Sequence, residues 1–246
     1  MAVISDPVVR NIVVLPGVFA PSLVALALTA RSEGKEGVRR LLGSIFRGPV
    51  AARWYVFAAT YTAAIKLSAA LLHRAITGEW PLFGQIPWYV LVGATLLSTP
   101  VQAGEEIGWR GYALPGLARR MGLAKASVLL GIVWACWHLP FFFMPGTDTS
   151  GQSFPLYLAQ VTAYSAAAAF LFWRAGGCLL PVMLLHAAVN NTKDIVPSAE
   201  PGATNPLAWS HSLVAWLTVA LLWICAAYFL ARMRGVRTIA PEVGPA

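Results

Sequence analysis

Long apolar stretches dominate this chain of 246 residues, of which 58% are hydrophobic and only 11% are charged. Soluble domains carry about 25% charged residues, so a soluble fold of this composition could not cover its surface with ionised groups. A helix that crosses a bilayer needs about 20 predominantly apolar residues. The stretches that meet this requirement are 11–30, 54–73, 86–112, 123–142, 154–173, 178–196 and 209–231. The sequence therefore predicts an all-α, polytopic helix bundle of about seven spans, in a single membrane domain over residues 1–246.

Basic residues are distributed unevenly about these spans, with fourteen of the 18 Lys and Arg residues on one side. Because Lys and Arg are enriched in cytoplasmic loops, we expect a multi-pass protein of the cell membrane with its N-terminus outside and its C-terminus in the cytoplasm. The formal net charge of +8 is then a topology signal, and we expect no nucleic-acid partner. Segment 31–53 is predicted to be a basic interfacial segment that contacts membrane lipid on the cytoplasmic side, and 238–246 a disordered tail.

Two adjacent acidic residues, Glu105 and Glu106, lie within a largely apolar region. Ionisable side chains in the hydrocarbon layer cost at least about 2.5–3.5 kcal/mol each, so they are functional candidates by default. Glu106 and Arg110 are four residues apart and share a helical face, which favours a salt bridge. Glu105 is turned about 100° away from that face and is expected to face a cavity. The alternative is that both acids only cap a helix end at the interface.

Two further polar pairs occur in later spans, with the same spacing of four residues. His138 follows Trp134 in one span, and His186 and Asn190 share a helical face in another. Either pair alone could be explained by hydrogen bonds within the helix bundle. Helical rise places His138 about 20 Å from the inner end of its span, near the middle of a hydrocarbon core about 30 Å thick. We therefore expect these side chains and Glu105 to converge in a cavity that opens toward the cytoplasm.

The three motifs resemble the marks of a known family of intramembrane proteases. They read Glu105-Glu106-x-x-x-Arg110, Trp134-x-x-x-His138 and His186-x-x-x-Asn190. In this order they resemble the CPBP family (CAAX prenyl protease and bacteriocin-processing), also described as the Abi or type II CAAX endopeptidase group. The resemblance covers a protease core at about residues 86–195, on predicted spans three to six. Trp134 occupies a position where phenylalanine is commonest in this family. Some members have eight spans, so the prediction for this chain is about seven spans with eight as the alternative.

The resemblance implies an endopeptidase in which Glu105 is the general base that activates water. His138 would share this water and help to protonate the leaving amine, while His186 and Asn190 would donate to the oxyanion. Glu106 and Arg110 would hold the helix. This arrangement requires no cofactor. In the alternative, Glu105, His138 and His186 bind zinc with water in the open position, although the H-E-x-x-H spacing of most zinc proteases is absent. The cofactor therefore stays open.

The resemblance indicates the type of reaction more closely than it indicates the identity of the substrate. Eukaryotic relatives remove the last three residues after a prenylated cysteine, and bacterial relatives are linked to peptide maturation or bacteriocin self-immunity. We expect a membrane-anchored or lipidated peptide or protein substrate and leave its identity and the oligomeric state open. A small-molecule transporter would more often show inverted repeats, and a non-catalytic scaffold would have lost a catalytic residue. Lys66, within the second span, is expected to pair inside the bundle or to extend to its edge.

Overall fold

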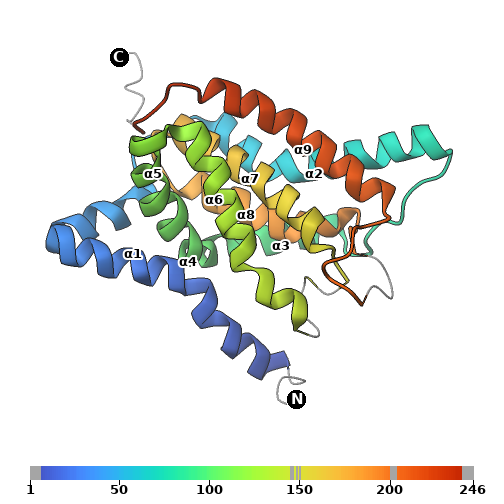
Figure 1. Cartoon of the computed structure of the whole chain (residues 1–246), viewed down its shortest axis with the longest axis horizontal. Coiled ribbons are helices and arrows are strands. Elements are labelled where there is room, and N and C mark those ends of the chain that lie inside the picture. Colours follow the sequence, from blue (N-terminus) through green and yellow to red (C-terminus); the bar gives the residue numbers. More distant parts are fainter. Residues whose placement is uncertain (1–6, 145–146, 148, 150, 200–203, 240–246) are drawn as a thin grey trace.

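The computed structural model describes residues 7–239 apart from 145–146, 148, 150 and 200–203, and every regular element in this described part is helical (Figure 1). The longer helices are α1 (Pro7–Gly43), α2 (Ala52–Thr77), α6 (Leu123–Trp137), α7 (Phe154–Arg174) and α9 (Leu213–Arg232). The shorter ones are α3 (Trp88–Ser98), α4 (Ala103–Glu106), α5 (Leu114–Met121) and α8 (Leu180–Thr192). The predicted all-α bundle is confirmed. Most of the predicted tail, at 240–246, lies outside the described residues.

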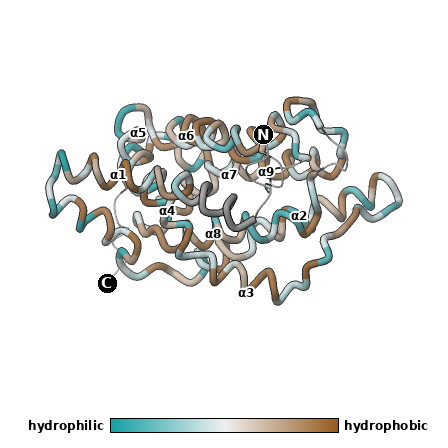
Figure 2. Tube along the Cα trace, turned by 90° about the horizontal axis from the view of Figure 1, so that it is seen from below, coloured by the Kyte–Doolittle hydropathy of each residue, from teal (hydrophilic) through white to brown (hydrophobic). Residues whose placement is uncertain are grey.

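Four helical segments are long and apolar enough to cross a membrane. They are Ala52–Thr77, Leu123–Phe143, Phe154–Arg174 and Leu213–Arg232. Each coincides with a predicted span, so the chain is a polytopic helical membrane protein. Figure 2 shows apolar residues along α2 and α3 as well as inside the bundle, and many large apolar side chains on these two helices are exposed. Such surfaces suit contact with lipid.

The other predicted spans differ in outcome. The stretch 11–30 lies within α1, which contains Pro16 and Pro21 and is kinked at Gly34 (φ 64°), after the predicted span ends. The stretch 178–196 forms only the 13 residues of α8, about 20 Å of helix, and a 3-10 turn follows it. This stretch is therefore a shorter helix than predicted.

The stretch 86–112 becomes a helical path whose hydrogen-bonding pattern changes along its length. After α3 come the 3-10 turn η2 (Thr99–Gln102), α4 and the π-helix η3 (Ile107–Ala113), followed by α5. Pro100 lies at the start of η2, and the path ends at Gly122, whose φ is 84°. π-Helical turns are frequent at functional sites. Glu105 and Glu106 lie immediately before this one, well inside the helical path as expected.

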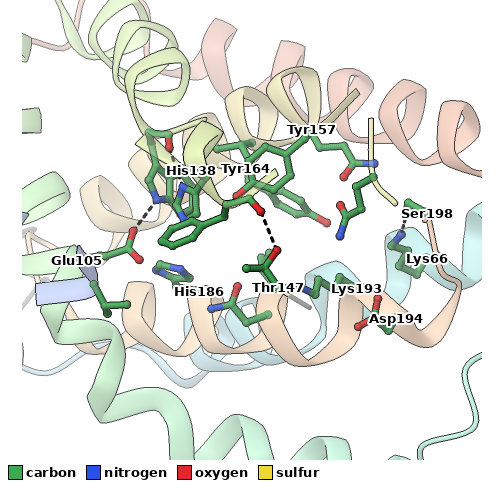
Figure 3. Close-up of a pocket in the computed structure, with 18 residues that line it drawn as sticks. Lys66, Glu105, His138, Thr147, Tyr157, Tyr164, His186, Lys193, Asp194 and Ser198 are labelled. Atoms are coloured by element: carbon green, nitrogen blue, oxygen red, sulfur yellow. Dashed lines mark hydrogen bonds between the residues drawn. The ribbon is translucent and has the colours of Figure 1, made fainter. Parts of the chain in front are cut away.

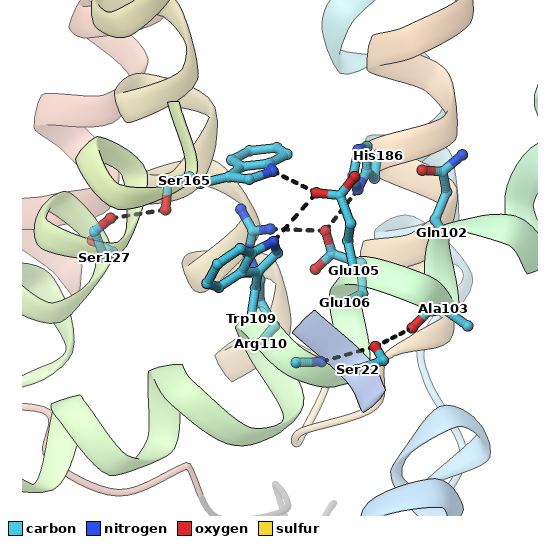
Figure 4. A network of polar contacts seen from close by, with 12 residues as sticks. Ser22, Gln102, Ala103, Glu105, Glu106, Trp109, Arg110, Ser127, Ser165 and His186 are labelled. Atoms are coloured by element: carbon cyan, nitrogen blue, oxygen red, sulfur yellow. Dashed lines mark hydrogen bonds and ion pairs between the residues drawn. The ribbon is translucent and has the colours of Figure 1, made fainter. Parts of the chain in front are cut away.

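Helix α1 packs closely against the segment that carries the two glutamates. Gly104 and Gly108 both face α1, and a Cβ atom at Gly108 would lie 2.4 Å from the carbonyl carbon of Pro21. Small residues spaced in this way let two membrane helices approach closely. Ser22 Oγ donates a hydrogen bond to the carbonyl oxygen of Ala103 (2.7 Å) and accepts one from the amide of Gly108 (3.2 Å) (Figure 4). These contacts fix α4 and η3 against α1.

Helix α7 lies between α6 and α9 in Figure 1 and is the most buried of the four candidate spans. Its contact with α6 is close because a Cβ atom at Gly131 would lie 2.7 Å from the Cα of Thr162. Ser165 Oγ also donates a hydrogen bond to the carbonyl oxygen of Ser127 (2.8 Å). These contacts hold the body of α6 against α7, and His138 directly follows the last residue of α6.

The two ends of the bundle differ in charge. The second half of α1, helix α5 and the residues that follow α9 carry eight of the 18 Lys and Arg residues, and Figure 1 shows these segments at the same end. The C-terminal end of α2 and the 3-10 turns η4 (Leu139–Phe143) and η5 (Lys193–Ile195) lie toward the opposite end. These segments belong to the side that the sequence predicted to be cytoplasmic. We call these the basic end and the opposite end.

Candidate active site

One cavity of about 570 Å³ brings together the four residues that the sequence predicted to be catalytic (Figure 3). Glu105 lies in α4, and His138 is the residue directly after α6. His186 and Asn190 both lie in α8. A cavity of this volume falls in the range of small-ligand sites. Three helices that are far apart in the sequence therefore contribute to a single pocket.

The carboxylate of Glu105 is held by two tryptophans. Its Oε2 atom accepts hydrogen bonds from the indole Nε1 of Trp134 at 2.7 Å and of Trp109 at 3.2 Å (Figure 4). Glu105 is only 6% exposed, and hydrogen bonds to an ionised acceptor are stronger than those between neutral groups. Among the described residues, none donates a hydrogen bond to the other oxygen, Oε1. The geometry fixes one oxygen and leaves the other for a ligand or water.

Glu106 lies in a fully buried network. The predicted salt bridge is present, with 2.8 Å between Arg110 Nη1 and Glu106 Oε1. The same Oε1 atom accepts a hydrogen bond from His186 Nδ1, also at 2.8 Å. The Arg110 guanidinium carbon lies 4.3 Å from the centre of the Trp134 ring, a distance typical of a cation–π contact. The Glu106 carboxylate thus connects the segment of α4 and η3 to α8.

His138 has a defined tautomer because of its position at the end of α6. Its Nδ1 atom lies 2.9 Å from the carbonyl oxygen of Trp134, and a carbonyl oxygen can only accept. Nδ1 therefore carries the hydrogen, and in the neutral ring Nε2 is the acceptor. The ring also packs against Phe141 and Tyr157. Nε2 can accept a hydrogen bond from water or take up a proton.

Asn190 lies one helical turn after His186 and is exposed to the cavity. Its Nδ2 atom donates only a long hydrogen bond, 3.4 Å, to Oε1 of Gln102. The neighbouring Asn191 points elsewhere, as expected, and donates to Ser98 Oγ at 3.0 Å. The two side-chain amides therefore have different roles. Asn191 connects α8 to α3, whereas Nδ2 of Asn190 can donate a hydrogen bond to a ligand.

The zinc alternative requires Glu105, His138 and His186 to converge on one ion. Zinc lies about 2.0–2.3 Å from its ligand atoms, so three such donors must lie within a few ångströms of a common point. In the part of the chain that the structure describes, no group of three or more His, Cys, Asp or Glu side chains is close enough to hold a metal ion. The residues of the zinc alternative do not form a metal site in this arrangement.

Several residues of the site were not assigned a role from the sequence. Trp109 and Trp134 bind Glu105 through their indole N–H groups, and Gln102 binds Asn190. Trp109 follows Glu105 by four residues, so helical spacing could have indicated it. Lys66 lines the same cavity. In the sequence, only its position within an apolar span distinguished it from other lysines. The predicted pairing of Lys66 within the bundle is confirmed, since Nζ donates to protein oxygens.

The cavity extends from Glu105 toward the opposite end of the bundle. Residues from the segments after η4 and after α8 line this part: Thr147, Gln152, Lys193, Asp194 and Ser198. The sequence predicted both a basic end in the cytoplasm and a cavity opening to the cytoplasm. In this fold the lining continues past Asn190 to the end of α8, which runs away from the basic end as it passes from His186 to Lys193. The side of the membrane to which the cavity opens stays a prediction.

The fold and the site define a polytopic helical membrane protein in which a carboxylate, two imidazoles and an amide share one buried cavity. Residues 84–192 match the family described as Rce1-like, type II CAAX prenyl endopeptidase Rce1-like. CAAX prenyl protease 2 of Methanococcus maripaludis is 31% identical over 143 residues, which cover 54% of this chain and 51% of that protein. The central segment is therefore similar to the Rce1-like type II CAAX prenyl endopeptidases, in agreement with the resemblance seen in the motifs. The chain spans about half the length of the curated relative that it matches.

Proposed function

We propose that this chain is an intramembrane endopeptidase that hydrolyses a peptide bond of a membrane-associated or lipidated peptide or protein. The observation that carries the proposal is the shared cavity of Glu105, His138, His186 and Asn190. These residues belong to the three motifs that indicated the family, and the matched family segment includes all of them. Peptide hydrolysis needs a base, a proton donor for the leaving amine and donors for an oxyanion. The cavity holds a side chain suited to each role.

Glu105 is proposed as the general base. Its Oε2 atom is fixed by the two indoles, so Oε1 takes a proton from water as the water oxygen attacks the carbonyl carbon of the peptide. The proton then passes through Nε2 of His138 to the amide nitrogen as the C–N bond breaks. The products are a carboxylic acid and an amine, the second water proton then passes from the acid to the amine to give a carboxylate and an ammonium, and Glu105 returns to its ionised form.

His186 and Asn190 are proposed as the donors to the oxyanion. Asn190 would donate through Nδ2, which now makes only a long hydrogen bond. His186 uses Nδ1 to donate to Glu106, so its protonated form carries a second N–H, on Nε2, that can bind the oxyanion. Glu106 orients this ring in the way that a carboxylate orients the histidine of a hydrolytic triad. Arg110 in turn holds Glu106.

The catalytic proposal is tested with the purified full-length chain in liposomes and a panel of prenylated and acylated peptides, including one that ends in a prenylated Cys-aliphatic-aliphatic-X sequence. Glu105→Gln keeps the shape of the side chain but removes the base. General-base catalysis contributes about 10²- to 10⁴-fold, and we expect a loss of this size in kcat. The matched control is Glu79→Gln, at an exposed position outside the cavity. If Glu105→Gln cleaves like the wild type, a non-catalytic scaffold or transporter becomes the better explanation.

For the orientation, we keep the basic end on the cytoplasmic side, because the distribution of Lys and Arg carries the topology signal. The test uses single cysteines in a background without Cys136, Cys178 and Cys225, labelled in intact cells with a maleimide that does not cross membranes. Thr147→Cys, beside the cavity, should react in intact cells, and Arg234→Cys should react only after permeabilisation. The reverse pattern would place the cavity on the cytoplasmic side and contradict the orientation.

A further inference from the structure

A lysine and a serine form a pair at the end of the cavity that is distant from Glu105. Lys66 comes from α2, and Ser198 lies in the irregular chain that follows α8 and η5. Figure 3 shows these two residues on one side of the cavity and Glu105 on the other. The proposed peptide hydrolysis uses neither of them. Their pairing therefore needs a separate explanation.

The hydrogen bonds of Lys66 are compatible with a role as a base. Its Nζ atom lies 2.9 Å from the carbonyl oxygen of Val196 and 2.9 Å from Ser198 Oγ. The carbonyl oxygen can only accept, so Nζ donates to it. A hydroxyl both donates and accepts, so the contact with Ser198 can form in two directions. An ammonium donates to Oγ, whereas a neutral amine accepts the hydroxyl proton and is then placed to remove it.

The surroundings of Lys66 are those of a reactive lysine. The residue is only 3% exposed, and among the described residues no ion pair includes it. Asp194 attracts its charged form electrostatically, but the side chain of Asp194 is exposed. A buried ammonium without an ion pair costs several kcal/mol, and lysines that act as general bases in enzymes are buried in this way.

Ser198 is placed where a ligand can reach it. It is only partly buried and lines the cavity together with Lys66. A serine hydroxyl is a weak nucleophile until an adjacent base takes its proton. A serine paired with a lysine is one of the recurrent variants of the hydrolytic triad. The pair of Ser198 and Lys66 thus has the two groups that nucleophilic catalysis requires.

We propose that Ser198 and Lys66 form a second catalytic site, which hydrolyses an acyl ester or thioester through an acyl-serine intermediate. Ser198 is the nucleophile and Lys66 is the general base. This activity goes beyond the proposed peptide hydrolysis and does not depend on Glu105. The ester of a membrane lipid and the thioester of an S-acylated peptide share the required chemistry.

The reaction balances with water as the only co-reactant. Ser198 Oγ attacks the acyl carbonyl carbon while Lys66 Nζ takes the hydroxyl proton. The bond to the alcohol oxygen or thiol sulfur then breaks, and Nζ gives the proton to this leaving group. A water oxygen next attacks the acyl-serine, Nζ takes a water proton, and Oγ receives it as the bond between Oγ and the carbonyl carbon breaks. The products are a carboxylic acid and an alcohol or thiol.

The rest of the lining suits an acyl substrate. Negative charge develops on the carbonyl oxygen during each attack, and nearby donors or positive charges stabilise it. Lys193 lies beside Lys66 at this end of the cavity (Figure 3) and provides such a charge. Val161 and Val189 also line the cavity and offer apolar contacts to an acyl chain.

The first test uses a fluorophosphonate probe, in which an activated serine oxygen displaces fluoride and becomes bonded to phosphorus. The purified full-length chain in liposomes is treated with the probe, and mass spectrometry locates the adduct. We expect the adduct at Ser198 and its loss in Ser198→Ala. The matched control, Ser68→Ala at an exposed position of α2, should react like the wild type. An unreactive wild type, or an adduct that persists in Ser198→Ala, would overturn the proposal.

A second test asks whether Lys66 is a base or only a support for the chain. Arginine keeps the positive charge and the donors but cannot be deprotonated, so we expect Lys66→Arg to react with the probe at least about 100-fold more slowly. Lys66→Met, with no base and no charge, should show the same loss. Rates are compared per amount of folded protein, and Lys35→Arg at an exposed position of α1 is the control. A wild-type rate in either Lys66 variant would assign Lys66 to support alone and contradict the proposal.

The third test measures turnover in the variant Glu105→Gln, so that failure of the second site is distinguished from failure of the proposed peptide hydrolysis. Liposomes contain either a phospholipid with labelled acyl chains or a peptide with a labelled S-acyl group. Release of fatty acid from the phospholipid identifies an ester substrate, and release from the peptide identifies a thioester. The additional change Ser198→Ala should abolish either release. If neither substrate releases fatty acid, the second activity is wrong, whatever the result for Glu105 and peptides.

Discussion

The two ends of the cavity are built in different ways. At one end, helical residues hold Glu105 and Glu106 through indoles, a guanidinium and an imidazole that are all largely buried. At the other end, Lys66 is held by Val196 and Ser198, which follow the last turn of α8 in irregular chain. Proton transfer requires reacting groups at fixed distances, and the helical end provides such distances. The difference therefore separates a chemical end that is built by helices from a lysine end that is held by irregular chain.

The largest effect is expected from breaking the network at the chemical end. Glu106→Gln removes the charge that Arg110 and His186 share, and breaking a buried ion pair costs about 3–5 kcal/mol. We expect a large loss of thermal stability in detergent and a loss of activity. The double variant Glu106→Gln/Arg110→Met should recover stability because no buried charge is left unpaired. Its activity should stay low, since His186 still lacks its carboxylate. Recovery of activity in the double variant would mean that Glu106 serves only Arg110.

A smaller effect is expected from changing the support of the chemical end. Gly108→Ala places a Cβ atom 2.4 Å from the backbone of Pro21, and such overpacking typically costs about 1–3 kcal/mol. The matched control is Gly93→Ala in α3, where nothing lies within 4 Å of the added Cβ atom. Alanine is a better helix former than glycine, so this variant should be as stable as the wild type or more so. Equal melting temperatures for the two variants would show that α1 does not restrain the glutamates.

A single hydrogen bond at the chemical end provides the next test. Trp134→Phe keeps an aromatic ring beside Arg110 but removes the 2.7 Å hydrogen bond to Glu105. Hydrogen bonds to charged groups contribute about 1.5–3 kcal/mol, and because Trp109 remains we expect a decrease in kcat of about tenfold. Trp137→Phe, at an exposed neighbouring position, is the control. A wild-type kcat in Trp134→Phe would show that the indole does not orient the base.

The smallest effect is expected at the lysine end. Asp194→Asn removes the negative charge that attracts the Lys66 ammonium, and exposed charges contribute only about 0.2–1 kcal/mol. The melting temperature in detergent should therefore fall by no more than about 2–4 °C. A loss as large as that of Glu106→Gln would mean that Asp194 holds Lys66 as firmly as Arg110 holds Glu106, and the two ends would no longer differ as described.

Contacts within one helix could be predicted from the sequence, whereas contacts between helices could not. The spacing of four residues predicted the salt bridge of Glu106 with Arg110 and the common face of His186 and Asn190, because helix geometry decides both. The hydrogen bond of Glu106 with His186 joins residues 80 positions apart, and no local pattern indicates it. The same holds for the indole of Trp134 on Glu105.

Helix lengths could be predicted less well than helix faces. Hydropathy sums over a window and does not detect where the hydrogen-bonding pattern changes, so 178–196 was predicted as one span although α8 ends at Thr192 and a 3-10 turn follows. The position of Lys66 in the cavity depends on how α8 packs against α2, and the distribution of charges does not indicate this packing.

The Oε1 atom of Glu106 has a mechanical consequence as well as a chemical one. It joins the π-helical segment to α8, while Trp134 at the end of α6 packs on both Arg110 and His186. Sliding the π-helical segment along α8 would break the hydrogen bond between Glu106 and His186, and sliding α6 would separate Trp134 from Arg110 and His186, so these contacts couple the three segments. A peptide that enters the cavity can displace other parts of the wall without breaking these contacts. Among the described residues these parts are Val18 of α1, Lys66 of α2, four residues of α7 and the irregular chain after η4 and α8, which all lie outside the network of Glu106.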